Sequence, residues 1–248
     1  MCKQDGRSME RPMKTTGALE VLKLNKPGLI LLAARPGMGK TSLALHMALN
    51  TEKGRNAAIF SLEMSSERLA AWICFSALSA EENRQLPETV YCSGSPRLSV
   101  ADIYAKCRRL DGLGLVVIDY LQLMIFADGQ NQDRGARWQM VSDISRGLKT
   151  MAKELNVPVL CLSQLSRAVD ERDNKRPMLS DLGYSGAIAQ EADVVSFLYR
   201  DDYYHKNSKT PGIVEYIIAK NLHGETGTVE MRWAPECAWL SAKDPGQP

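Results

Sequence analysis

The 248-residue sequence has no stretch that approaches the ~20 consecutive apolar residues of a membrane span. Its first residues, Met1 to Arg7, lack the apolar segment of a secretory signal peptide. The six cysteines include no CxxC pair and no metal-ligand spacing, which argues against a zinc module and favours a reducing compartment. These absences predict a cytoplasmic protein that does not contact a membrane.

The chain also lacks a strong charge bias, because 31 Lys and Arg residues against 29 Asp and Glu residues leave a formal net charge of +2. Any contact with a polyanion must therefore come from local placement of Lys and Arg. A hydrophobic content of 44% over this length is enough for one large core. We expect one domain at residues 17–240, a flexible arm at residues 1–16 and a frayed tail at residues 241–248.

Short aliphatic runs alternate with helical stretches along the chain. The predicted strands are residues 29–33, 57–62, 115–118, 157–162 and 194–199. The predicted helices are residues 41–49, 65–80, 100–110 and 137–155. Residues 212–219 and 227–233 flank a short polar turn and predict a β-hairpin. The pattern predicts an α/β fold with a mainly parallel sheet, covered by helices on both faces, and a C-terminal hairpin.

The most informative motif is a glycine-rich string between a predicted strand and a predicted helix, which is the setting of a phosphate-binding P-loop. The string is Ala34-Arg35-Pro36-Gly37-Met38-Gly39-Lys40-Thr41, followed by Ser42. Its small residues let backbone N–H groups close around phosphates, while Lys40 reaches the β- and γ-oxygens and Thr41 ligates Mg²⁺. Ala34 stands where the usual pattern has a glycine. The motif predicts a nucleoside triphosphate site at residues 35–42, and the alternative is a chance match on a glycine turn.

Two acidic residues follow other predicted strands. Asp119 ends the apolar run at residues 115–118, at the edge where open α/β sheets bind ligands, and is predicted to hold Mg²⁺ together with Thr41. Glu63 follows the strand at residues 57–62 in the same manner. It would orient or deprotonate the attacking water if its strand lies close to the P-loop strand. The alternative is an acid that only favours the start of the next helix, and spacing alone does not separate the two.

An amide and a long charged segment follow the strand at residues 157–162. Gln164 lies where it would sense the γ-phosphate, and the alternative is a polar residue that simply ends a strand. Residues 166–186 are predicted to have little regular structure and to carry four basic residues: Arg167, Arg172, Lys175 and Arg176. Long loops in compact domains are usually functional or disordered, and a loop tied to Gln164 would let hydrolysis move a surface that binds DNA or a partner. Its acidic residues leave a simply solvated loop as the alternative.

Taken together, these motifs resemble the C-terminal RecA-like motor domain of DnaB-type replicative helicases, the superfamily 4 ring ATPases, over roughly residues 15–240. The resemblance is carried by the P-loop string and by residues 60–65, 117–124, 148–159, 162–167, 175–177, 180–182, 192–195 and 197–201. It implies a RecA-like P-loop NTPase that binds ATP and Mg²⁺ and couples ATP hydrolysis to translocation on single-stranded DNA. The implied setting is DNA replication, in a chromosomal, phage or mobile-element system.

The resemblance also implies roles for individual residues. Glu63 is implied as the catalytic base, with Lys40 and Gln164 as further catalytic residues, and Arg200 is implied to contact the nucleotide. Lys220 is implied to act on the nucleotide of a neighbouring subunit. The implied DNA-binding residues are Arg167, Lys175, Arg176, Gly183, Tyr184, Ser185 and Gly186. The implied partners are single-stranded DNA, further copies of the chain in a homo-hexamer, and a primase or helicase loader.

The sequence departs from the family pattern at three places. The family pattern at the hairpin is a lysine, then any residue, then an arginine that acts as the arginine finger. This sequence has Lys220-Asn221-Leu222 there, so Leu222 stands at the arginine-finger position. The family's arginine-glutamate-serine-glycine reads Gly183-Tyr184-Ser185-Gly186, in which Tyr184 would stack on a base. The segment between Trp72 and Val90 is shorter than usual. The first two departures favour a second hypothesis, an ATP-binding regulatory or assembly protein with weak ATPase activity. A third hypothesis, a RecA-type recombination ATPase, fits residues 120–124 and 180–182 less well.

Overall fold

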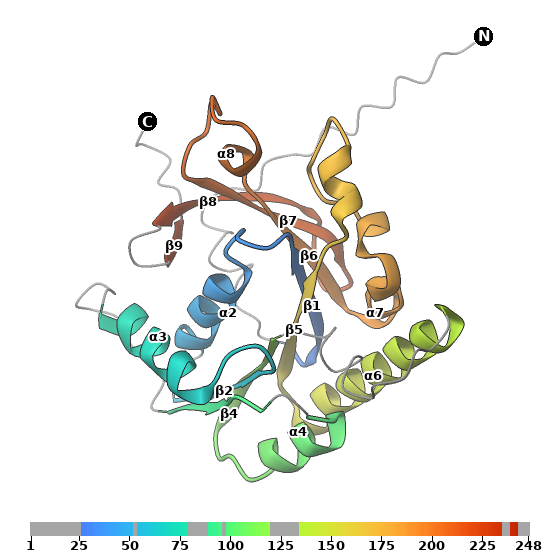
Figure 1. Cartoon of the computed structure of the whole chain (residues 1–248). Helices are drawn as coiled ribbons and strands as arrows, with labels where there is room; N and C mark the ends of the chain where they lie inside the picture. The colour runs from blue at the N-terminus through green and yellow to red at the C-terminus, as the bar shows by residue number, and fades with distance from the viewer. Residues whose placement is uncertain are drawn as a thin grey trace.

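The computed structural model describes residues 26–51, 54–78, 89–95, 98–119, 134–234 and 239–242. In these residues nine strands form one sheet in the order β3-β2-β4-β5-β1-β6-β7-β8-β9, as Figure 1 shows. The strands are β1 (Gly28–Ala34), β2 (Asn56–Ser61), β3 (Val90–Ser93), β4 (Leu113–Asp119), β5 (Pro158–Gln164), β6 (Val194–Tyr199), β7 (Ile213–Asn221), β8 (Gly227–Ala234) and β9 (Trp239–Ala242). The helices are α2 (Lys40–Leu49), α3 (Ser66–Leu78), α4 (Val100–Cys107), α6 (Arg134–Leu155), α7 (Gly186–Glu191) and α8 (Asp201–Tyr204), and the 3-10 helices are η1 (Arg167–Glu171) and η2 (Leu179–Ser185).

The sheet is parallel from β3 to β6 and antiparallel from β6 to β9. The strand β1 lies in the middle, between β5 and β6, and every residue of it is buried. Such a continuous apolar run is typical of a parallel strand that is covered on both faces, where no alternation with polar residues is needed. The predicted α/β fold with a mainly parallel sheet and a C-terminal hairpin is confirmed.

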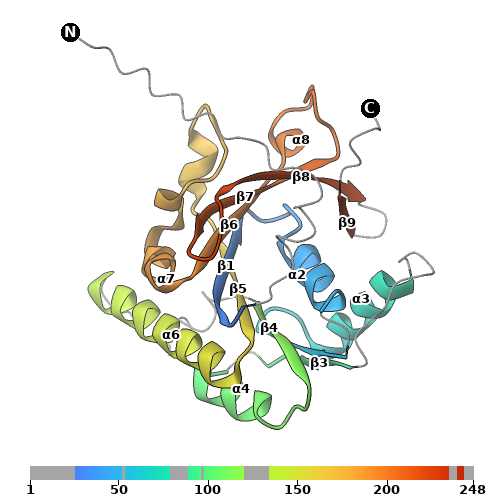
Figure 2. The same ribbon diagram turned by 180° about the vertical axis from the view of Figure 1, so that it is seen from behind.

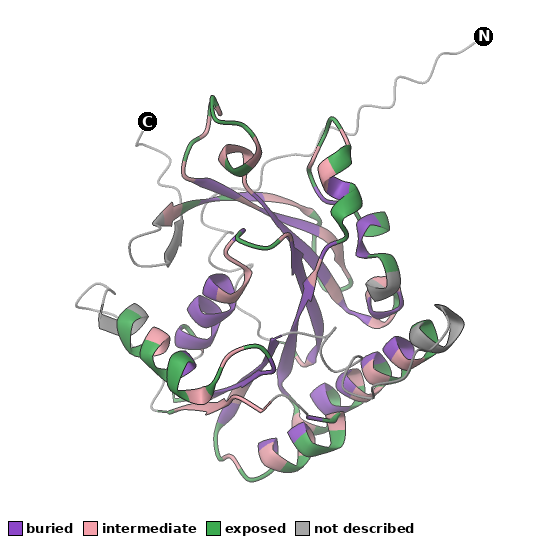
Figure 3. Ribbon diagram, in the orientation of Figure 1, coloured by how far each residue is buried: buried purple, intermediate pink, exposed green. Residues whose placement is uncertain are grey.

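Two helical layers cover the sheet, as the opposite views in Figures 1 and 2 show. Leu29 and Leu31 of β1 belong to a buried cluster with residues of α4, α6 and α7. Ile30 and Leu32 belong to a second buried cluster with residues of α2 and α3. Figure 3 shows the resulting pattern, in which the central strands and the inner sides of the helices are buried. Each fully buried aliphatic side chain of this kind contributes roughly 1.5–3 kcal/mol. None of the described helices combines the length and the apolar character needed to cross a membrane.

Most predicted helices and strands match the structure to within a few residues, and the differences have local causes. The helix α4 begins with a capping box in which Ser99 and Asp102 bond each other's backbone N–H groups, but it ends at Cys107 and not at residue 110. The N–H groups of Arg109 and Leu110 donate to carbonyls three residues earlier, those of Lys106 and Cys107. Such bonds are typical of a tighter 3-10 turn, so the α-helix ends before these residues. The short strand β3 was not predicted, because its four residues are all half-buried and show no alternation.

The predicted ends of the domain and one predicted segment need comment. Ser241 and Ala242, assigned above to a frayed tail, belong to β9 and pair with β8. The rest of that tail, the predicted arm at residues 1–16 and the helicase-like string at residues 120–124 lie outside the described residues. Residues 166–186 are not structure-poor as predicted, because η1 and η2 occupy much of the segment. The ion pairs that order it are described with the site.

Asp193, directly before β6, ties the start of β1 to the long helix α6. Its Oδ2 accepts a hydrogen bond from the backbone N–H of Leu29 at 2.9 Å, and its Oδ1 pairs with the Lys149 ammonium at 3.0 Å. Gly28 leaves room for this carboxylate, since a Cβ at residue 28 would lie 2.8 Å from Oδ2. The resemblance to the helicase family included Asp193 without a role, and the structure gives it one in anchoring the central strand.

We expect Asp193→Ala to lower the free energy of unfolding by about 1–3 kcal/mol, because the substitution leaves the buried N–H of Leu29 without an acceptor. Lys149→Met is the comparison variant, since it removes the ion pair and the hydrogen bond from the Lys149 ammonium to the Glu191 carbonyl but keeps the bond from Leu29 to Asp193, and it should cost less than Asp193→Ala. Urea unfolding followed by circular dichroism measures both values. Equal losses for the two variants would contradict the anchoring role of the hydrogen bond.

Candidate nucleotide-binding site

A cavity of about 370 Å³ lies at the carboxyl ends of the parallel strands. It brings together segments that are far apart in the sequence. Its lining residues are Arg35, Pro36, Gly37, Gly39, Lys40, Thr41, Ser42, Glu63, Trp72, Gln164 and Trp233. Of the residues predicted to contact the nucleotide or its Mg²⁺, Met38, Asp119 and Arg200 do not line this cavity. The Met38 side chain is buried in the core cluster with α2, so its predicted contact with the nucleotide would be made by the backbone N–H.

The P-loop has the backbone geometry that a phosphate cradle requires. Gly37 and Gly39 have φ angles of 78° and 90°, a region that glycine enters without steric cost. Gly39 precedes α2 as its N-cap and provides no side-chain hydrogen bond to the helix. The N-terminus of a helix presents unpaired N–H groups and a positive dipole end, which together favour an anion. The loop is therefore shaped to hold a phosphate group at the start of α2.

Thr41, which lines the cavity, forms a polar pair with Asp119, where β4 ends beside α2. The Thr41 hydroxyl donates to Asp119 Oδ2 at 3.0 Å. Asp119 is 3% exposed, and its Oδ1 has no hydrogen-bond partner among the described residues. Burial raises the pKa of Asp119, against the opposing effects of the Lys40 charge and the Thr41 hydrogen bond. Burial also lowers the pKa of Lys40, against the attraction of Asp119 and Glu63.

These residues fit a Mg²⁺ ion. A buried carboxylate oxygen without a partner is costly, and a cation would satisfy it. In nucleotide sites Mg²⁺ takes one or two protein oxygens and fills its other positions with phosphate oxygens and water. The Thr41 hydroxyl and Asp119 Oδ1 would supply two such oxygens next to the P-loop, and their role as Mg²⁺ ligands stays a prediction.

Glu63 and Gln164 reach the same cavity from two other strands. Gln164 ends β5 directly opposite Ala34, the last residue of β1. The strand β2 is not adjacent to β1, because β4 and β5 lie between them, yet Glu63 still lines the cavity two residues beyond the end of β2. The acid in the first turn of α3 is Glu67, so Glu63 is not needed to start that helix. The structure therefore favours the water-orienting interpretation of Glu63 over the helix-start alternative.

Two aromatic side chains in the cavity, Trp72 and Trp233, were not predicted from the sequence. Trp233 packs against the P-loop so closely that a Cβ on Gly39 would lie 2.9 Å from its ring. The Arg200 guanidinium lies 5.5 Å from the centre of the Trp233 ring and pairs with Asp202. Arg200 thus contacts a wall of the cavity without lining it. No local motif marks Trp233, which comes from the last part of the hairpin and reaches the P-loop only through the fold of the sheet.

The predicted DNA-binding cations differ in how they are bound within the chain. Arg176 forms two hydrogen bonds to Glu215, at 2.6 and 2.8 Å, and lies 4.7 Å from the centre of the Tyr199 ring. Lys175 donates to the backbone carbonyls of Asp170 and Arg172. Arg167 is exposed and makes no hydrogen bond or ion pair with any described residue. The alternative of a simply solvated loop is therefore wrong for Lys175 and Arg176, whereas Arg167 is available to a ligand.

The backbone conformation at residue 183 favours a glycine. Gly183 joins two turns of 3-10 helix with φ 56° and ψ −123°, and the space around its Cβ position is open. A residue with a side chain would be strained in this conformation. Gly186 begins α7, and the side chains of Tyr184 and Ser185 lie outside the described part of the structure. The predicted stacking of Tyr184 on a base stays a prediction.

Lys220 and Leu222 lie at the opposite end of the sheet from the cavity. Lys220 is paired with Val195 at the start of β6, and its ammonium donates to the carbonyls of Ala189 and Gln190 at 2.9 Å each. A cation at the end of a helix is favoured by the helix dipole, so Lys220 stabilises the end of α7 in its own chain. Leu222 is 60% exposed. Neither residue reaches the cavity of its own chain, and any role on a nucleotide would be in a neighbouring copy.

The sheet order and the cavity at the strand ends define a RecA-like P-loop domain of the α/β class. The family model of the DnaB-like helicase C terminal domain matches residues 20–89 and 75–241. The chain belongs to this family.

Individual relatives agree with this assignment. The chain is 46% identical over 233 residues to the replicative DNA helicase DnaB of Geobacillus stearothermophilus, covering 84% of this chain and 51% of that protein. It resembles a separately solved ATPase domain with a TM-score of 0.76 and 36% identity, over 88% of this chain and 85% of that one. A DnaB-like replicative helicase studied with primase gives a TM-score of 0.77 and 36% identity, over 89% and 58% of the two chains. The chain spans about half the length of the curated relatives it matches.

We expect Lys40→Ala to abolish stabilisation by MgATP and to leave the melting temperature of the free protein within about 2 °C, because Lys40 faces the ligand site. In the wild type, MgATP at a hundredfold excess over Kd should add about 2.7 kcal/mol. Lys209→Ala, a substitution of an exposed lysine, is the matched control and should behave as the wild type. Differential scanning fluorimetry measures both. A full MgATP-induced shift in Lys40→Ala would contradict the assignment.

Proposed function

We propose that this chain is the ATP-hydrolysing motor domain of a DnaB-like DNA helicase, which binds single-stranded DNA and couples hydrolysis to translocation during replication. The observation that carries the proposal is the convergence of the P-loop, Glu63 and Gln164 in one cavity, where the lining residue Thr41 is hydrogen-bonded to the buried Asp119. A family match over most of the chain and relatives named as replicative DNA helicases support it. The predicted cytoplasmic location stays a prediction.

Each residue of the cavity has a task that follows from its chemistry. The P-loop N–H groups and the Lys40 ammonium bind the β- and γ-phosphates and neutralise their charge. Thr41 and Asp119 would hold Mg²⁺, which would supply positive charge against the charge that develops on the phosphates. Glu63 accepts a proton from the attacking water and orients it toward the γ-phosphate. Gln164 donates or accepts a hydrogen bond at the same phosphate and so distinguishes the triphosphate from the products.

The aromatic wall formed by Trp233 and Arg200 is proposed to contact the nucleobase. An indole ring offers a flat apolar face, and a guanidinium stacked on that ring adds a cation to it. The pair Arg200–Asp202 keeps the guanidinium over Trp233. Arg200 would thus act on the nucleotide through Trp233 and not by direct contact.

Single-stranded DNA is proposed to bind along residues 167–186, with Arg167 as the first contact because it is exposed and unpaired among the described residues. Lys175 and Arg176 would bind phosphate only after exchanging their present partners. The proposed assembly is a homo-hexameric ring, and the proposed partners include a primase or a helicase loader. The family membership supports these proposals. A structural relative, a DnaB-like replicative helicase described with its interactions with primase, also supports them.

A Glu63→Gln substitution tests the chemical step. We expect kcat for ATP hydrolysis to fall by about 10²–10⁴-fold, because the amide does not accept the proton of the attacking water. The Kd for MgATP should stay within about threefold, since binding depends on the P-loop and Mg²⁺. Glu67→Gln, in the first turn of the neighbouring helix, is the control and should retain full turnover. Full turnover in Glu63→Gln would show that another group activates the water.

Leu222 favours a second candidate function, an ATP-binding regulatory or assembly protein with weak ATPase activity. Leucine does not stabilise phosphoryl charge, whereas an arginine supplied by a neighbouring subunit is worth about 10³–10⁵ in rate. The exposed position of Leu222, far from the cavity of its own chain, fits a residue that would face a neighbouring copy. The two candidates differ in how they respond to a restored arginine.

For a weakened motor, Leu222→Arg should raise the DNA-stimulated kcat by tenfold or more, which is roughly 1.4 kcal/mol of transition-state stabilisation. The rates must be compared at one salt concentration, because phosphate contacts of DNA-binding cations depend on salt. Leu222→Gln is the matched control, since it is polar without a positive charge. No gain in a variant that still binds ATP and assembles would reject the weakened motor. It would favour either a motor in which another residue takes the place of the arginine or the regulatory candidate.

A further inference from the structure

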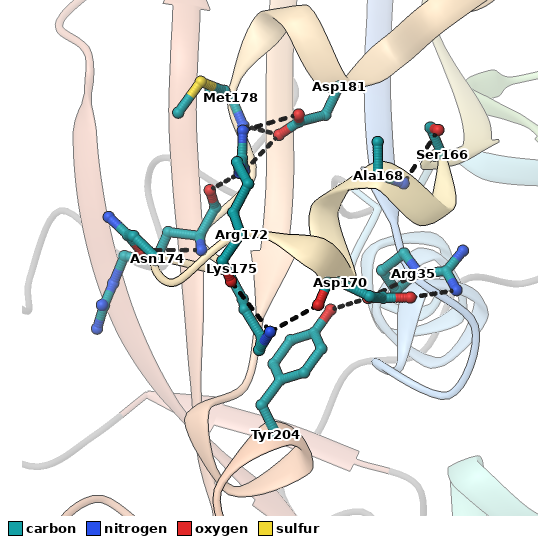
Figure 4. A network of polar contacts seen from close by, with 11 residues as sticks. Arg35, Ser166, Ala168, Asp170, Arg172, Asn174, Lys175, Met178, Asp181 and Tyr204 are labelled. Carbon is teal, nitrogen blue, oxygen red and sulfur yellow. Dashed lines mark hydrogen bonds and ion pairs between the residues drawn. The ribbon is translucent and has the colours of Figure 1, made fainter.

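The Asp170 carboxylate joins three segments that are separate in the sequence. Its Oδ2 accepts from the Arg35 guanidinium at 2.7 Å, and its Oδ1 accepts from Arg35 Nε at 3.2 Å. The Tyr204 hydroxyl of α8 donates to Oδ1 at 2.9 Å. Figure 4 shows Arg35 and Tyr204 pointing toward Asp170 from different elements. The P-loop, η1 and α8 therefore meet at one side chain.

Arg35 lies between the cavity and the charged segment. Its side chain is 11% exposed, and its NH1 donates to the carbonyl of Leu165 at 3.0 Å. The N–H of Leu165 in turn donates to the carbonyl of Ala34 at 3.1 Å. Because Leu165 directly follows Gln164, the strand end that carries the proposed γ-phosphate contact is bonded to the P-loop in both directions. Arg35 continues this connection to Asp170.

Asp170 is also joined to the residues that follow it. Lys175 donates to the backbone carbonyl of Asp170 at 2.7 Å and lies 5.6 Å from the centre of the Tyr204 ring. Arg172 pairs with Asp181 and donates to the carbonyl of Arg176, so the turn at residues 171–181 is closed on itself (Figure 4). A displacement of Asp170 would therefore be passed to the backbone that carries the basic residues.

The charge state of Asp170 supports this role. Burial alone would raise the pKa of the carboxyl, but the hydrogen bonds from Arg35 and Tyr204 outweigh burial and hold the pKa below its ordinary value. The carboxylate is thus ionised at neutral pH. Bidentate pairs of arginine and carboxylate have a defined geometry, which suits them to transmit position as well as charge.

We propose that Asp170 is a positioning residue that couples the nucleotide cavity to the basic segment at residues 167–176. It acts through Arg35, which keeps this segment in register with the P-loop and with the strand end at Gln164. When nucleotide changes the position of that strand end, Asp170 moves the basic segment with it. The inference rests on the proposed function, because it names the residue through which the nucleotide site would reach a DNA-binding surface.

The experiment compares hydrogen exchange of the full chain with and without a nonhydrolysable ATP analogue and Mg²⁺. The variant is Asp170→Asn, which keeps the size of the side chain and removes its charge. The matched control is Asp173→Asn, an exposed residue of the same segment that makes no hydrogen bond or ion pair with any described residue. Two regions are followed, the P-loop at residues 34–42 and the segment at residues 166–178.

In the wild type and in Asp173→Asn, the analogue should slow exchange in both regions. In Asp170→Asn, the P-loop should keep its protection, while the nucleotide-induced change in residues 166–178 should fall by at least about tenfold. A loss of stability alone would raise exchange with and without nucleotide and would not remove the difference between the two states. Tyr204→Phe, which removes one hydrogen bond to Asp170, should give a smaller reduction and replaces Asp170→Asn if that variant does not fold.

Three results would overturn the inference. If residues 166–178 respond to the analogue in Asp170→Asn as in the wild type, Asp170 does not couple the two regions. If the P-loop also loses protection, Asp170 belongs to the nucleotide site itself. If the wild-type P-loop shows no protection, the proposed function fails and the coupling fails with it.

Discussion

The pairing of β1 with β5 is the constraint on which the rest of the structure depends. The two strands are parallel neighbours along the whole of β1, from Gly28 opposite Pro158 to Ala34 opposite Gln164. Parallel strands end at the same edge of a sheet, so this register brings the P-loop and Gln164 to one place. The strand β4, on the other side of β5, brings Asp119 to the same edge. A shift of one residue would exchange the side chains of a strand between the two buried clusters on opposite faces of the sheet and separate these groups.

Charged groups in the described part of the molecule are arranged differently inside and outside the cavity. At the cavity, Lys40 is partly buried and Asp119 is buried, and burial disfavours the charge of each residue while their mutual attraction opposes that effect. Such a pair contributes little to the stability of the fold and is typical of a functional site that binds a charged ligand. Outside, Asp170 and Arg176 hold their partners in defined geometry. Those pairs order residues 166–186, and the same pairs set which cations remain available to DNA.

The sequence predicts the fold well because the central strands are continuous apolar runs and the P-loop requires a strand before it and a helix after it. Lys40 and Thr41 follow from the P-loop motif itself, and Glu63 and Gln164 follow because each lies just after the end of a predicted strand. Trp233 could not be found in this way, because its contact with the P-loop depends on how the antiparallel strands curve past β1.

The charged segment at residues 166–186 shows the other limit of sequence reasoning. Its composition is that of a solvated loop, and its order comes from partners that are distant along the chain. Arg35, for example, pairs with Asp170, and Arg176 pairs with Glu215. Lys220 likewise matches a family motif by position, yet its ammonium binds the carbonyls at the end of α7. Pairings of this kind are set by the tertiary fold, and local patterns do not contain them.

The most direct test of the central claim is a high-resolution structure of the chain with Mg²⁺ and a nonhydrolysable ATP analogue. The account predicts that the triphosphate lies in the P-loop with Lys40 at its β- and γ-oxygens. It also predicts that Mg²⁺ lies within coordination distance of the Thr41 hydroxyl and close to Asp119, and that Glu63 faces the γ-phosphate through a water molecule. A nucleotide bound elsewhere, or an intact Thr41–Asp119 hydrogen bond with no metal beside a bound triphosphate, would contradict the account.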